Sequence, residues 1–200
     1  MITSSAPDIN RSWIVITPPE YEPITVDELK LFARIDGTEE DALLEGFITG
    51  VREAAELYLG RALMTQTLHM VMDSWPESGM IELPQPPLLS ISKVAIRDEL
   101  GAETIYSASN YYVVTESIPG QLVIRNGSTP PSNTARFNSG YLIEFAAGYG
   151  DDASDVPQVI KEGLKVWATY VYEQRNLTPE PPPEARSLLN MFKVMRPINI

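Results

Sequence analysis

Apolar residues recur at two different periods along the chain, and the change of period divides it into three parts. Over residues 39–59 they come every three or four positions, which places them on one face of a helix of about 21 residues. From residue 64 to about residue 150 the period falls to two, which is typical of short β-strands. Helical spacing returns over residues 156–175. The pattern predicts helices at both ends and a β region between them.

Capping signals set the ends of the first two predicted helices. Thr25 and Glu28 have the spacing of a capping box before a short helix, in which Phe32 is expected to face inward. Thr38 is the expected N-cap of the long helix. Gly60 stands where a left-handed residue ends a helix. Both helices therefore have start or stop signals in the sequence itself.

The last fifty residues predict two more helices and a stiff link. Asp155 and Gln158 resemble a capping box at the start of the third long helix. The stretch LTPEPPPE then forms an extended, Pro-rich spacer. A short helix follows over residues 184–194.

The elements together predict an α+β fold. It is a small bundle of about four helices with an antiparallel β region inserted between the second and third helices. The expected parts are an N-terminal arm and helical hairpin (1–63), the β insertion (64–150), a helix completing the bundle (151–176), and a linker, short helix and C-terminal docking tail (177–200).

Charge and composition exclude several classes of protein. The 200 residues include 27 acidic and 15 basic side chains, so the net charge of −12 disfavours sequence-specific binding of nucleic acid. The chain has no cysteine, which removes disulfides and thiolate sites. Neither a signal peptide nor a membrane span is expected. The last sixteen residues differ in sign, with Arg186, Lys193 and Arg196 and no acid. They suit either a basic helix end or a docking tail for an acidic partner.

Candidate chemistry is sparse. The single histidine, His69, lies in a predicted strand far from any ligand spacing, and no nucleotide-binding, serine-hydrolase or zinc-protease motif occurs. Asp151, Asp152 and Asp155 lack the spacing of a calcium loop. We therefore expect no enzyme activity, no metal and no cofactor. Tyr111, Tyr112 and Tyr141 leave open a carbohydrate- or peptide-binding β module, provided that they are exposed in a row.

Three stretches in the same order resemble one known family. They are ITPPEYEPITVDELKLFARIDGTEEDALLEGFITGVREAAELYLGRALMTQT, IELPQPPLLSISKVAIRDELGAETIYSASNYYV and FAAGYGDDASDVPQVIKEGLKVWATYVYEQRN. Their order is similar to that in the head–tail connector (adaptor) proteins of long-tailed phages and gene transfer agents. The resemblance covers about residues 14–194.

The resemblance implies a structural protein of the virion. Such adaptors form a ring of roughly a dozen copies under the portal, at the neck of a phage or phage-like particle. The ring extends the DNA channel toward a stopper or tail-completion protein, and DNA passes through without sequence-specific binding. No membrane is involved, and assembly takes place in the host cytoplasm. The alternative is another neck protein, namely a stopper or tail-completion protein itself.

The resemblance also implies two sets of contact residues. The portal-binding set is Ser187, Leu188, Leu189, Met191, Phe192, Lys193, Val194, Met195, Arg196, Ile198 and Ile200. Removal of residues 187–200 is expected to abolish portal binding and to leave the fold intact.

The second expected set forms the oligomer interface. It comprises Gly46, Gly50, Arg52, Glu53 and Glu56 on the long helix, where the two glycines would permit close approach of another helix. Residues 1–63 carry 12 acidic and 5 basic side chains. This excess suggests an acidic channel wall that repels DNA phosphates.

Overall fold

The computed structural model describes residues 10–131, 135–176 and 178–194. Its elements form two compact units, one of strands and one of helices. Of the described residues, the β unit takes 10–18 and those within 66–147, and the helical unit takes 19–65 and those within 148–194. The structure therefore has the α+β class that the sequence predicted.

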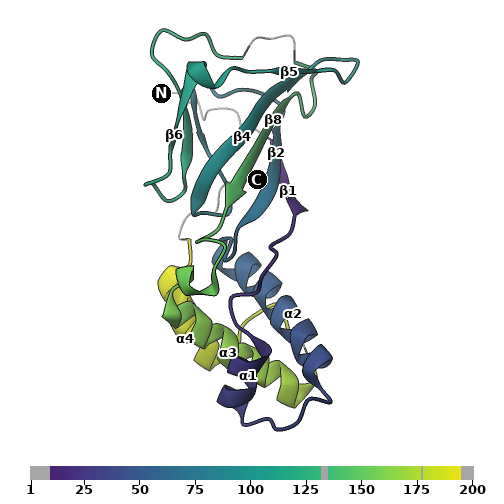
Figure 1. Cartoon of the computed structure of the whole chain (residues 1–200). Coiled ribbons are helices and arrows are strands. Elements are labelled where there is room, and N and C mark those ends of the chain that lie inside the picture. The colour runs from purple at the N-terminus through teal and green to yellow at the C-terminus, as the bar shows by residue number, and fades with distance from the viewer. Residues whose placement is uncertain (1–9, 132–134, 177, 195–200) are drawn as a thin grey trace, which may run out of the picture. The chain divides into compact units, whose positions relative to one another are not determined.

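The described part of the helical unit contains four α-helices. They are α1 (Val26–Ala33), α2 (Asp41–Leu59), α3 (Gln158–Gln174) and α4 (Pro183–Leu189), which Figure 1 shows packed together. α3 contacts each of the other three, and its Trp167 is fully buried in the shared apolar core. Helices from the two ends of the chain thus bury each other's apolar faces, as predicted.

The caps that depend on local sequence are confirmed. The backbone N–H of Glu28 donates to Thr25 Oγ1 (3.1 Å), and the backbone N–H of Thr25 donates to Glu28 Oε2 (2.9 Å). Gly60 ends α2 with φ +65°, in the left-handed region that favours glycine. Both helix ends are therefore fixed by the residues that signalled them.

The predicted cap at Thr38 is wrong. α2 begins at Asp41, because the segment before it forms a turn that is held by side chains. The N–H of Thr38 donates to the carboxylate of Glu39 (3.0 Å), and the ammonium of Lys30 bonds to Asp41 Oδ1 (2.8 Å). Side-chain bonds in the turn thus replace the expected N-cap.

Two further local predictions are also corrected. Phe32 was expected to face inward but is 44% exposed, because the short helix α1 buries only Leu29. The ammonium of Lys165 lies 5.6 Å from the Phe32 ring centroid. Asp155 does not cap α3. It belongs to a 3₁₀ turn that it closes with Asp152, and α3 starts after Pro157.

The close approach of two helices takes place at Gly163 rather than at Gly46. A Cβ built on Gly46 would have no atom of the described chain within 4 Å. A Cβ built on Gly163 would lie 2.9 Å from Cγ and Cδ2 of Leu189, which is fully buried. α4 therefore packs on α3 at a position where no side chain fits.

The β unit contains two antiparallel sheets in its described part. The larger has the order β1 (Arg11–Thr17), β2 (Gln66–Met72), β8 (Tyr141–Ala147), β4 (Leu88–Arg97), β5 (Glu103–Ile105), and the smaller has the order β3 (Met80–Glu82), β7 (Gln121–Ile124), β6 (Tyr111–Val114). Figure 1 shows β1, β2, β8 and β4 side by side.

Buried and partly buried residues alternate along the strands of the larger sheet, so one face of the sheet is buried in the core of the β unit. Met70 of β2 pairs with Ile143 of β8, and both are buried. The next residue of β2, His69, is only partly buried and pairs with Glu144. Because side chains on a strand alternate between faces, the sheet has one apolar face and one mixed face.

β1 extends this sheet from a position before the helices in the chain. Its residues Arg11 to Thr17 pair with β2, with an irregularity between Val15 and Thr17. The run SWIVIT is thus an edge strand of the β unit, although it lies within residues 1–63, the part that the sequence analysis grouped with the helices.

Candidate assembly surfaces

The residues after α4 form a strap along the end of α2. This C-terminal strap, residues 190–194, begins with a 3₁₀ turn (Asn190–Phe192). The N–H of Val194 donates to the carbonyl of Leu59 (2.9 Å), and the hydroxyl of Tyr58 donates to Asn190 Oδ1 (2.6 Å). Both ends of the strap are therefore bonded to the last turn of α2.

Two cations reinforce this attachment. The ammonium of Lys193 lies 3.9 Å from the ring centroid of Tyr58, within the range of a cation–π interaction. Nε of Arg61 donates to the carbonyl of Phe192, and the Arg61 side chain is buried. Positive charge at the C-terminal end of a helix also suits the helix dipole.

The structure divides the predicted portal-binding residues into four groups. Ser187, Met191 and Lys193 are exposed, Leu188, Phe192 and Val194 are partly buried, Leu189 is fully buried, and Met195, Arg196, Ile198 and Ile200 lie outside the described residues. Leu189 holds α4 against α3 from inside and offers no surface in the isolated subunit. Met191 is 72% exposed and is the largest apolar side chain that the strap presents.

The predicted oligomer-interface residues also differ in their burial within the subunit. Arg52 and Glu56 are buried in the subunit, so they are corrected from surface to interior residues. Arg52 Nε donates to Glu22 Oε2 (2.8 Å), and its Nη1 donates to Glu56 Oε2 (3.0 Å). The other oxygen of Glu56 accepts the N–H of Leu63 (2.8 Å). This network joins three segments of the helical unit.

The remaining members of that set lie along one stripe of α2. Gly46 and Glu53 are exposed, and Gly50 is partly buried. Leu57, which is 73% exposed, continues the stripe. Their spacings of four, three and four residues place all of them on one helical face. The face is open enough for another helix to approach.

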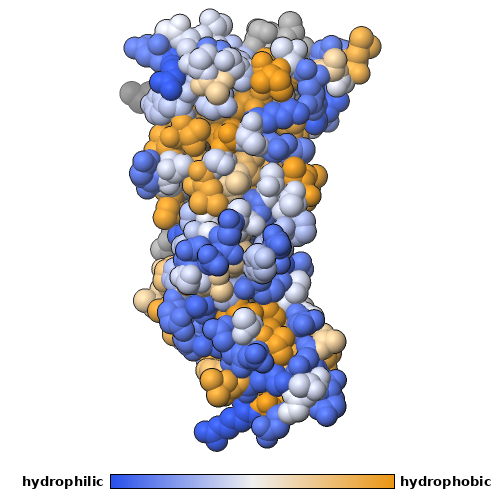
Figure 2. Space-filling view, viewed as in Figure 1, coloured by the Kyte–Doolittle hydropathy of each residue, from blue (hydrophilic) through white to orange (hydrophobic). Residues whose placement is uncertain are grey.

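Exposed apolar side chains occur on both units. On the face drawn in Figure 2, orange patches reach the surface of the strand-rich and of the helical part. In the β unit, Ile14 is 62% exposed, Leu100 94% and Phe137 92%. Contiguous apolar patches mark surfaces that bind other proteins, whereas single exposed apolar side chains are common on any protein.

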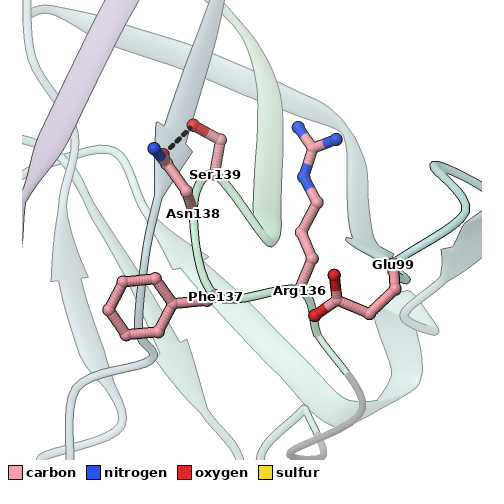
Figure 3. A pocket seen from close by; sticks show the side chains of 5 residues that line it. All are labelled: Glu99, Arg136, Phe137, Asn138 and Ser139. Carbon is pink, nitrogen blue, oxygen red and sulfur yellow. Dashed lines mark hydrogen bonds between the residues drawn. The ribbon is translucent and has the colours of Figure 1, made fainter.

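A shallow pocket lies at one end of the larger sheet. Its volume is about 480 Å³, and it is lined by Glu99, Arg136, Phe137, Asn138 and Ser139 (Figure 3). Ser139 Oγ donates to Asn138 Oδ1 (3.0 Å). The lining offers single charges and an amide on loops, with no paired carboxylates and no nucleophile beside a base. It has the character of a contact surface rather than of a catalytic cleft.

Sequence reasoning missed one polar group on the mixed face of the sheet. His69 Nε2 lies 2.8 Å from Glu144 Oε2, and Ser92 Oγ donates to Glu144 Oε1 (3.0 Å). These bonds, the one from His69 first, lower the pKa of the Glu144 carboxyl below its ordinary value. The carboxylate separates the hydroxyl from the imidazole. The arrangement therefore lacks the serine–histidine bond of a hydrolase.

The tyrosines do not form an exposed row. Tyr111 and Tyr141 are 6% and 5% exposed, and Tyr112 is 44% exposed. Tyr106 stacks on Tyr111 with ring centroids 6.2 Å apart, and Trp75 meets Tyr141 at 5.7 Å. The aromatic rings thus pack mainly with one another, and the requirement for a carbohydrate-binding surface is not met.

Within residues 10–131, 135–176 and 178–194, no group of three or more metal-ligating side chains is close enough to hold an ion. No helix in that part of the chain has the length and apolar character to cross a bilayer.

Comparisons with known proteins give one family and one fold. The family model described as "Phage gp6-like head-tail connector protein" matches residues 23–123. No curated protein matches the sequence. The solved structures with a similar fold include chains from the neck of an empty gene transfer agent (GTA) particle computed with C6 symmetry and from the virion of a native GTA particle. A third comes from the neck of a native GTA particle computed with C12 symmetry.

The structural matches extend over nearly the whole of both chains. The first has a TM-score of 0.78 at 20% identity and covers 94% of this chain and 97% of the other. The second has a TM-score of 0.77 at 21% identity and covers 93% of this chain and 97% of the other. The third has a TM-score of 0.73 at 20% identity and covers 94% of this chain and 97% of the other. Identity at this level shows a shared fold. Because the family model matches just over half of the sequence, the chain belongs to the phage gp6-like head–tail connector family.

Proposed function

We propose that the protein assembles as a ring of about twelve copies on the portal, at the neck of a phage or gene transfer agent particle. The ring extends the DNA channel and binds a stopper or tail-completion protein on its other side. The protein contributes surfaces rather than chemistry, and DNA passes through without being read.

The C-terminal strap carries this proposal. Leu189 in the core and Val194 on Leu59 fix its two ends, so Met191 between them is held at the surface in one position. An apolar side chain that is ordered before binding loses little entropy when a partner covers it. With Lys193 and with Arg196 after it in the sequence, the strap suits a partner with an apolar pocket and an acidic rim.

The exposed stripe of α2 supports contact between copies. One face of α2 carries Gly46, Gly50 and Glu53. At Gly46 no described residue lies within 4 Å of where a Cβ would be, so the space there is open. A cyclic ring needs two different surfaces on each copy, and a glycine-bearing helix is one that permits close approach. We propose this stripe as one part of the ring contact.

The acidic residues of the helical unit suit the wall of a DNA channel. Asp27, Glu28 and Glu45 are all exposed. Negative charge facing the lumen would repel the phosphate backbone and let the duplex slide. A density map of the ring in which the lumen is lined by lysine and arginine would rule this out.

The test is co-purification of the full chain with the portal protein of its own particle. The structure changes the design that the sequence suggested, since removal of residues 187–200 would take Leu189 out of the core. We therefore expect loss of portal binding for Met191→Asp and for a chain that ends at Val194, with an unchanged circular dichroism spectrum. Leu100→Asp, which changes a more exposed apolar side chain on the β unit, should bind like the unmodified chain.

Retention of portal binding by both altered chains would refute the role of the strap. Binding only to the stopper or tail-completion protein would instead place the chain elsewhere in the neck. Sedimentation of the complex gives the number of copies, since each chain contributes 22.2 kDa.

A further inference from the structure

β1 has an edge with which no described strand pairs, and charged or proline residues stand only at its ends, at Arg11 and Pro18. Within the described residues it pairs only with β2. Ile14, Val15 and Ile16 are 62%, 42% and 40% exposed, and no charged residue or proline interrupts the run WIVIT. Natural proteins normally block such an edge with lysine, proline or a covering segment, because its unpaired N–H and C=O groups recruit other strands.

The opposite edge of the same sheet is also incomplete. β5 covers β4 only from Ala95 to Arg97, with one more backbone bond from Tyr106 to Val94. No described strand pairs with the outer edge of the earlier part of β4. Leu89, Ser90 and Ser92 are exposed there. The pairing of β4 with β8 has irregularities at Leu88/Ser90 and Ile91/Lys93, so this part of β4 is bulged.

The two free stretches lie at the same level of the sheet. Across the strands, Thr17 is in the row of Thr67, Ala146 and Ser90. Likewise, Val15 is in the row of Leu68, Phe145 and Ile91, so the match extends over both stretches.

The directions of the strands match as well. Each neighbouring pair in the order β1-β2-β8-β4 is antiparallel, so β1 and β4 run in opposite directions. Rotation about an axis parallel to the strands moves a copy sideways without shifting it along the axis. A neighbour placed in this way brings its free β4 edge to β1 in register and antiparallel.

We propose that residues 14–17 of β1 in one copy pair with residues 90–93 of β4 in the next copy, which joins the β units into one sheet around the ring. The proposal rests on the ring described above and names its contact. The occupant is a second copy because one sheet carries both complementary edges, as a head-to-tail interface requires. The backbone bonds have the geometry of strand addition, and the exposed isoleucines pack on the neighbour.

The chain has no cysteine, so any disulfide that forms in a cysteine variant must involve the introduced residues. Thr17 and Ser90 are exposed, and the shared row places them on the same face and opposite each other. Under oxidation, Thr17→Cys/Ser90→Cys should give a ladder of covalent multimers that collapses on reduction. Each single variant should remain monomeric on the gel, because a head-to-tail contact never brings two copies of one residue together.

Sedimentation of the same samples separates the two proposals. A ring without a ladder overturns this contact and leaves the ring intact. Covalent dimers of a single variant overturn it as well, because they show a two-fold contact. Neither ring nor ladder in samples that also contain the portal protein overturns both proposals.

A second variant tests the edge without cross-linking. Lysine at both Ile14 and Ile16 places two charges on the edge and should weaken ring formation roughly tenfold or more. Leu100→Lys adds a charge at a more exposed apolar site on a hairpin turn and should leave assembly unchanged. Equal behaviour of the two variants would contradict the contact.

Discussion

A Cβ built on Gly163 would lie 2.9 Å from two carbon atoms of Leu189, so α4 lies on α3 at a point where only hydrogen fits. Leu189 is fully buried there. The strap that follows it is bonded to Leu59 at Val194. The segment proposed to bind the portal thus begins inside the subunit core, and this contact is one of those that fix its position.

Gly163→Ala should destabilise the helical unit by about 1 kcal/mol, because overpacking costs roughly 1–3 kcal/mol and the gain in helix propensity returns about 1 kcal/mol. The Leu189 side chain and the backbone of α4 would have to move away. Urea unfolding followed by circular dichroism measures the effect. Increased stability would show that α4 yields without cost.

Gly46→Ala should have the opposite effect on the isolated chain. No atom of the described residues lies within 4 Å of the new Cβ, so the helix gains about 0.5–1 kcal/mol of stability. If α2 meets a neighbouring copy closely at Gly46, the same methyl group should weaken ring formation. Sedimentation at a series of concentrations measures the second effect. Unchanged assembly would remove Gly46 from the interface.

Glu56 and Glu53 both lie near the guanidinium of Arg52, and they differ in burial, so substitutions at the two positions can be compared. Glu56 has a 10% exposed side chain 3.0 Å from Nη1, whereas Glu53 is 65% exposed and 3.6 Å from Nη2. We expect Glu56→Gln to cost about 2 kcal/mol, because it removes the negative charge from a buried, hydrogen-bonded ion pair, while Glu22 still pairs with Arg52. Glu53→Gln should cost less than about 1 kcal/mol. Equal costs in urea unfolding would contradict the burial of the pair.

Local signals predicted the features whose causes lie within one turn. The Thr25–Glu28 box and the left-handed Gly60 need only neighbours in sequence. The burial of Arg52 could not be read in this way. Its partner Glu22 lies thirty residues earlier, on a segment that the sequence marks only with prolines. A charged residue on a helix is normally expected at the surface, and only the folded neighbour reverses this expectation.

The assembly surfaces were predicted unevenly for the same reason. The basic tail is visible in the sequence, but the core role of Leu189 depends on Gly163, a glycine in the middle of a helix whose partner follows a Pro-rich spacer. Which edge of β1 is free depends on the strand with which it pairs. That strand is β2, which follows β1 in the sequence only after both α1 and α2. Apolar alternation identifies a strand but does not give its neighbours.

The hairpin of β4 and β5 should lose stability in acid through Glu103. Its carboxylate accepts hydrogen bonds from Lys93 first and from Arg97 (2.9 Å), which lower its pKa below the ordinary glutamate value. The unfolded chain binds the proton at the ordinary pKa and the folded chain only at lower pH. The stabilisation is therefore complete above the ordinary pKa and is lost as pH falls through the folded-state pKa.

Glu103→Gln removes the titrating group. At neutral pH the variant should be less stable by about 1 kcal/mol or less, because these ion pairs are partly exposed. Its unfolding free energy should then fall less steeply than that of the unmodified chain across the acid window. Glu99→Gln removes the same charge from an exposed position of the same hairpin and serves as the control. If the difference between the unmodified chain and Glu103→Gln does not shrink on acidification, the carboxylate is not held by its two cations.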